Sequence, residues 1–171
     1  MKHIIRTACI AAAAFACAPR AEAQIKPFSF GVYGEAAFPT GSMSNTSTAG
    51  FGGGVGVEAR LPASLSATAS FGIIHFGGKD IVPAQSAYPT INAFPLRIGA
   101  KYRFNMFYVG LETGAIFSSI PDANDPKKDK TSALIAPAIG VRFANIDLRG
   151  KYESWFNAYR QFWGLQASVR F

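Results

Sequence analysis

The chain has 171 residues, 49% of them hydrophobic and 16% charged, and its formal net charge is +7. This length fits one domain, and two cysteines and two histidines leave little material for zinc sites, disulfide frameworks or histidine-based catalysis. A basic excess is typical of proteins that bind nucleic acids or anionic membranes, so the position of the charges has to distinguish the two.

The first 23 residues have the pattern of a cleaved secretory signal peptide. Lys2 and Arg6 supply the charged n-region, the apolar run "TACIAAAAFACA" follows, and "AEA" is a small-residue cleavage site. The apolar run is shorter than the roughly 18 residues expected of a transmembrane helix. A lipoprotein signal that ends at Cys17 is the alternative, but Ala14 stands where such signals carry a larger aliphatic residue.

We therefore expect a signal peptide at 1–23 and one mature domain at 24–171. Both cysteines leave with the signal, and the mature chain keeps 14 basic and 9 acidic residues, for a net charge of +5. Its one histidine is His75.

Apolar and polar residues alternate with a period of two after residue 24, as a pleated strand requires. The first predicted strand, "FSFGVYGEAAF" at 28–38, places its phenylalanines on one face and Glu35 on the other. The second, "FGGGVGVEARL" at 51–61, contains a glycine run, but no GxGxxG register is complete and no helix follows to receive a phosphate. The third is "SLSATASFGIIHF" at 64–76.

The alternation continues to the end of the sequence. The remaining predicted strands are 91–104, 107–117, 133–143, 146–156 and 163–171. Most of the eight have about 10 to 13 residues, close to the 9 to 11 that cross a bilayer at a tilt near 45°.

The connections between these strands alternate in length. Three are tight, around Pro62, Asn105 and Asn145. The others are predicted to be polar loops, at 40–50, 77–90 and 118–132, with a shorter fourth at 157–160. Short turns at one rim and long loops at the other are typical of an outer-membrane barrel.

The charges of the predicted strands share one face, and none lies on the apolar face. The charged face carries Glu35, Glu58, Arg60, Arg97, Lys101, Arg103, Glu112, Arg142, Asp147, Arg149, Lys151, Glu153 and Arg170. Eight alternating strands would also suit a soluble barrel with an apolar interior. However, the charged face is also rich in glycine, which weakens a solvent-facing strand but suits a narrow lumen filled by ion pairs. We therefore predict an all-β, eight-stranded antiparallel up-and-down transmembrane barrel with these charges inside.

The closing segment resembles the C-terminal signature of bacterial outer-membrane proteins, because Trp163, Leu165, Val169 and the terminal Phe171 form an apolar stripe. The stretches "FPLRIGAKYRF", "FYVGLETGAIF" and "SALIAPAIGVRF" resemble the small outer-membrane β-barrel family common in Bacteroidetes, similar in size to OmpX and the OmpA transmembrane domain. The resemblance implies a place in the outer membrane, with lipid and the barrel assembly machinery as partners. It implies that the stripe is the assembly signal.

The sequence favours a protein without catalytic residues, cofactor or metal. His75 falls on the lipid face near the long loops, so a lipid-modifying enzyme of the histidine type is the least favoured reading. The "DANDPKKDK" segment lacks the glycine and the final glutamate of an EF-hand. Because the charges face one another inside the barrel, we expect no nucleic-acid partner.

Two classes of function remain open. The first is a monomeric, non-enzymatic barrel that supports the envelope or contacts an extracellular ligand or host surface through its long loops. The second is a small passive channel, although the interior of eight strands is just wide enough for side chains to fill.

Overall fold

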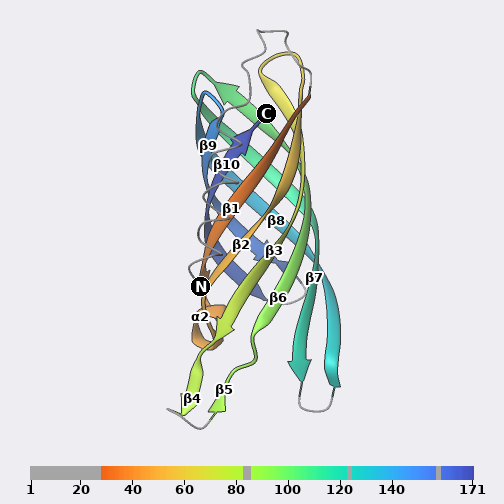
Figure 1. Cartoon of the computed structure of the whole chain (residues 1–171), viewed down its shortest axis with the longest axis vertical. Helices are drawn as coiled ribbons and strands as arrows, with labels where there is room; N and C mark the ends of the chain where they lie inside the picture. The colour runs from red at the N-terminus through yellow and green to blue at the C-terminus, as the bar shows by residue number, and fades with distance from the viewer. Residues whose placement is uncertain (1–27, 83–85, 123–124, 157–158) are drawn as a thin grey trace, which may run out of the picture.

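Eight long antiparallel strands close into a barrel in a computed structural model that describes residues 28–82, 86–122, 125–156 and 159–171 (Figure 1). Each strand pairs with its neighbour along the chain, and the first and last strands close the barrel in the order β1-β10-β9-β8-β7-β6-β3-β2. The strands are β1 (Phe28–Thr40), β2 (Ser47–Arg60), β3 (Leu65–Gly78), β6 (Ile91–Phe104), β7 (Phe107–Asp122), β8 (Asp125–Phe143), β9 (Ile146–Trp155) and β10 (Arg160–Arg170). The predicted eight-stranded up-and-down fold is confirmed.

Three short turns lie at the end of the barrel where β1 begins and β10 ends, which we call the short-turn end (Figure 1). The β6–β7 turn has only two residues, and its Asn105 adopts a φ of 58°. Asparagine tolerates this left-handed conformation better than most residues, which explains its use at so tight a turn.

The opposite end, which we call the long-connection end, contains more regular structure than the sequence predicted. The connection at 40–50 contains a short helix, α2 (Met43–Thr46), and the start of β2. The connection at 77–90 contains a two-stranded sheet of β4 (Asp80–Val82) and β5 (Ser86–Ala87). No helix in the described part of the chain is long and apolar enough to span a membrane.

The prediction of a loop at 118–132 was wrong, because β7 and β8 continue through most of this stretch. Their pairing extends to Asp122 and Asp125, so the β7–β8 hairpin projects at the long-connection end (Figure 1). Ser118, which we expected in a loop, is buried in β7, and its hydroxyl donates to the carbonyl oxygen of Lys130 at 3.2 Å. The polar composition of this stretch indicated contact with water. Contact with water does not prevent two strands from pairing, so the polar composition did not distinguish a hairpin from a loop.

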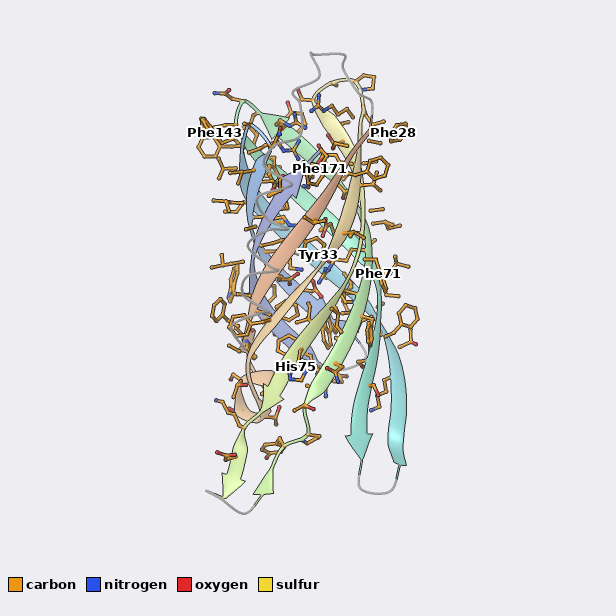
Figure 2. The ribbon with its side chains drawn as sticks, viewed as in Figure 1. Phe28, Tyr33, Phe71, His75, Phe143 and Phe171 are labelled. Atoms are coloured by element: carbon orange, nitrogen blue, oxygen red, sulfur yellow. The ribbon has the colours of Figure 1, made fainter. Side chains whose placement is uncertain are left out.

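The outer surface of the barrel is apolar. Phe28, Phe71, Phe143 and Phe171 are all about half exposed or more, whereas Tyr33 is buried inside (Figure 2). Charged side chains from the same strands are buried within the barrel. An apolar exterior around a polar interior is the arrangement of a transmembrane barrel.

Candidate functional site

The lumen at the short-turn end is centred on the fully buried carboxylate of Glu58 on β2. Arg142 on β8 donates to both of its oxygens, from Nη1 at 2.9 Å and from Nη2 at 2.7 Å. Arg170 Nη1 and Arg103 Nη2 lie 2.7 and 3.0 Å from the same carboxylate. Since β2 and β8 lie diametrically opposite in the strand order, the Glu58–Arg142 pair crosses the lumen.

Asp147 on β9 is the second anion at this level. It accepts hydrogen bonds from Arg142 Nη2 at 2.9 Å and from the Tyr108 hydroxyl at 2.5 Å. Arg170 Nη2 lies 3.3 Å and Lys101 Nζ 3.6 Å from its Oδ2 atom. We call these six charged residues the rim cluster: Glu58, Lys101, Arg103, Arg142, Asp147 and Arg170.

A second set of ion pairs lies deeper in the barrel. Arg97 on β6 donates from Nε to Glu153 on β9 at 2.9 Å, and its Nη2 lies 2.8 Å from the same oxygen. Lys151 Nζ lies 2.8 Å from both Glu35 and Glu153, and the Trp155 indole donates to Glu153 at 2.9 Å. All four charged side chains are fully buried. Charges at such depth are stable only when they are paired and hydrogen-bonded.

Glu112 and Arg149 form a third pair between β7 and β9. Arg149 Nη1 donates to Glu112 Oε1, and Nη2 donates to Gln166 at 2.5 Å. Both charged side chains are almost completely buried. Together with the two sets above, this pair fills the lumen with charged side chains from the short-turn end to about the middle of the barrel.

The long-connection half of the lumen is filled instead by an apolar plug, which the sequence analysis missed. The plug consists of Ala37, Met43, Ile74, Phe76, Ile91, Ala93, Ile116, Leu134, Ala136, Trp155 and Phe162. Three rings meet edge to face at its centre, with Phe76 5.5 Å from Phe162 and 6.2 Å from Trp155 between ring centroids. The sequence contains a sign of the plug in the adjacent apolar pairs Ile73–Ile74 and Trp155–Phe156. Two neighbours in a strand point to opposite faces, so an apolar pair means that the inner face is apolar there as well as the outer face.

Inward glycines make room for two buried tyrosines in the charged half. A Cβ atom on Gly54 would lie 2.7 Å from the Tyr33 hydroxyl, and one on Gly140 would collide with the ring of Tyr108. The glycine-rich inner face thus accommodates side chains from neighbouring strands.

Arg60 is the predicted interior charge that the structure does not enclose. It is the last residue of β2 at the short-turn rim and is exposed, because its strand leaves the lumen at that point. Arg103, which the sequence also placed on the charged face, does lie in the rim cluster, where its Nη2 is 3.0 Å from Glu58.

The other selected side chains lie on the outer surface. His75 is exposed, with Nδ1 2.7 Å from the Asn92 side-chain oxygen. The stripe of Trp163, Leu165, Val169 and Phe171 is exposed along β10. Within the described residues, no three His, Cys, Asp or Glu side chains are grouped so that they could hold a metal ion.

The sequence matches the family described as "Putative MetA-pathway of phenol degradation" over residues 10–171. The chain belongs to this family. A search of curated proteins finds no match.

Solved structures similar to this family member include small outer-membrane barrels. Neisserial surface protein A is 18% identical, with 85% of this chain and 96% of that chain covered and a TM-score of 0.60. Ail of Yersinia pestis is 14% identical, with 84% and 99% covered and a TM-score of 0.59. The N-terminal barrel domain of Pseudomonas aeruginosa OprF is 13% identical, with 84% and 97% covered and a TM-score of 0.56. At these identities the likeness concerns the fold alone.

Proposed function

We propose that this chain is a non-enzymatic barrel of the bacterial outer membrane that supports the envelope and contacts external partners at its long-connection end. The observation that carries the proposal is the Glu58–Arg142 pair, which joins opposite strands across the lumen. The apolar plug fills the other half of the same lumen. A barrel obstructed at two levels has its outer and end surfaces, rather than its interior, available to partners.

The projecting hairpins support a role in surface contact. The β4–β5 and β7–β8 hairpins project at the long-connection end (Figure 1). Ail, which has the same fold, is described as an attachment invasion locus protein and has been solved with the heparin analogue sucrose octasulfate. Because these hairpins project from the barrel, we expect the partner of this chain to bind there.

A passive channel is the second candidate function. The family description names phenol degradation, and a plug with Phe76, Trp155 and Phe162 at its centre would present aromatic rings to a small aromatic solute. The plug residues are fully buried, so this function requires that the plug opens.

Planar-bilayer conductance separates the two functions. We expect the purified protein to give no steady conductance, because ion pairs and the plug block the lumen. Uptake of phenolsulfonate, a charged phenol, into protein-containing vesicles is the companion measurement, with protein-free vesicles as the control. Steady conductance or protein-dependent uptake would replace the first proposal with the channel.

We propose that residues 1–23 direct export, that the mature domain is 24–171, and that the short-turn end faces the periplasm. Residues 1–27, including Cys17, lie outside the described part of the structure. Membership of the Bacteroidetes, OmpX-like group remains a prediction, as does the monomeric state.

The assembly role of the β10 stripe is tested by replacing Phe171 with serine. Phe171 pairs with Phe30 of β1 at the seam, where its N–H donates to the Phe30 carbonyl oxygen at 2.8 Å. We expect less protein in the outer-membrane fraction, because an unclosed seam leaves backbone groups unpaired in lipid. Phe28→Ser is the matched control, since Phe28 is also an outward phenylalanine at the short-turn end. Equal losses for both variants would mean that Phe171 is only a lipid contact.

A further inference from the structure

A polar cavity of about 30 Å³ lies in the lumen where the rim cluster meets the Glu112–Arg149 pair. Its polar lining includes Ser70, Lys101, Glu112, Asp147, Arg149 and Arg170. The cavity therefore lies between side chains that carry opposite charges.

Four of the lining residues carry a buried polar atom that has no hydrogen-bond partner among the described protein groups: Ser70 Oγ, Glu112 Oε2, Arg149 Nε and Arg170 Nε. Both terminal nitrogens of Arg170 lie in ion pairs, those of Arg149 bind Glu112 and the Gln166 side-chain oxygen, and each arginine retains its Nε. Glu112 and Arg149 are 4% and 5% exposed, so bulk water does not reach most of their surface. Buried groups of this kind are normally satisfied by a protein group or an ordered water molecule.

We infer that this cavity binds about two ordered water molecules, which complete the hydrogen bonding of the charge network. A water molecule needs roughly 10–15 Å³ of such volume and two to four polar partners, so the space and the lining both fit two. The unpaired atoms are the N–H donors of Arg149 and Arg170, one Glu112 carboxylate oxygen and the Ser70 hydroxyl. A ligand that satisfies all of them has to both donate and accept hydrogen bonds.

Ions match this lining less well than water does. A halide accepts hydrogen bonds only, so it would satisfy the two arginine nitrogens but face the carboxylates of Glu112 and Asp147. A metal cation would face Lys101 and the two arginines. Water satisfies the donors and the acceptors without adding charge.

Filling the cavity with one methyl group tests the inference. Gly56 lines the cavity, and a Cβ atom placed there would lie 3.3 Å from the Ala69 carbonyl oxygen and 3.5 Å from Ser70 Cβ. Gly110 is a matched control on the same inner face, because its Cβ would have equally close neighbours at 3.3 and 3.4 Å but it does not line the cavity. Both changes give the strand the same gain in propensity over glycine.

We expect Gly56→Ala to unfold at a temperature at least about 2 °C below that of Gly110→Ala, because displaced water leaves buried polar atoms unsatisfied. An equal or higher midpoint for Gly56→Ala would overturn the inference, since filling a dry void stabilises a protein.

A high-resolution structure of the unaltered protein, from crystals soaked in bromide, gives a readout that does not depend on any variant folding. Water density within hydrogen-bond distance of Arg149 Nε and Glu112 Oε2 supports the inference. An anomalous bromide peak in the cavity, or side chains that close it by bonding to one another, would refute it.

Discussion

Replacing Glu58 with alanine should lower the free energy of unfolding by about 3 kcal/mol, because one carboxylate holds several cations in the rim cluster. Arg142 Nη2 and Arg170 Nη1 each lie 2.7 Å from Glu58 Oε2, so the two nitrogens are at most about 5.4 Å apart. Without the Glu58 carboxylate, two unit charges at that distance repel by about 3 kcal/mol at an effective dielectric constant of 20, and Asp147, which contacts both arginines, offsets only part of this repulsion.

Two effects adjust this magnitude in opposite directions. Removing one partner of a buried pair typically costs about 3–5 kcal/mol, which would raise the estimate. The Arg142 and Arg170 side chains are 10% and 16% exposed, so water entering from the short-turn end would hydrate them and lower it. We therefore take the lower end of the range.

Urea unfolding of the protein in lipid vesicles, followed by tryptophan fluorescence, measures the loss. Arg60→Ala is the control, because Arg60 is a charged residue two positions along the same strand that is exposed at the rim, and we expect a change within about 0.5 kcal/mol. A Glu58→Ala loss below about 1 kcal/mol would show that the pairs contribute no more than surface salt bridges do. The ion pairs of the rim cluster would then not stabilise the barrel.

Two further predictions concern the two faces of the strands. Brominated lipid should quench the fluorescence of a variant that retains only Trp163, which is 57% exposed, and leave a variant that retains only Trp155, which is 1% exposed, nearly unchanged; equal quenching would contradict the inside–outside assignment. Gly140→Ala should cost about 1–3 kcal/mol by overpacking against Tyr108, whereas Gly34→Ala should cost little, because no atom lies within 4 Å of its added Cβ. Comparable urea midpoints for the two glycine variants would argue against tight packing in the lumen.

The positions of the strands were predictable because alternation is a local property of the pleated backbone. Glu58, Glu112 and Glu153 lie inside the barrel because each is an even number of positions away from the other inward residues of its strand. The tight turn at Asn105 was also predictable from the sequence. A two-residue connection between two alternating segments allows only one pairing register between the two strands. Neither inference needed knowledge of which strands lie opposite each other.

The extent of the strands beyond the lumen was not predictable in the same way. At 118–132 the β7–β8 hairpin continues in a mostly polar sequence, so the alternation of apolar and polar residues on which the prediction depended is lost. Arg60 lies two positions after the inward residue Glu58 and so belongs to the same face of the strand, but it lies past the rim and is exposed. The alternation along a strand specifies toward which face each side chain points. Only the closed barrel specifies where the enclosed space ends.

The sequence by itself determined the number of strands, their antiparallel order and the face that each charge occupies, because these follow from a period of two and from connection lengths. Only the tertiary structure decided that Glu58 meets Arg142 across the lumen, that Glu153 meets Arg97, and that apolar side chains rather than charges fill the long-connection half. The physical reason is the stagger between neighbouring strands, which sets the level that each inward residue reaches when the sheet closes. That level accumulates over all eight pairings, and no single segment of the sequence contains it.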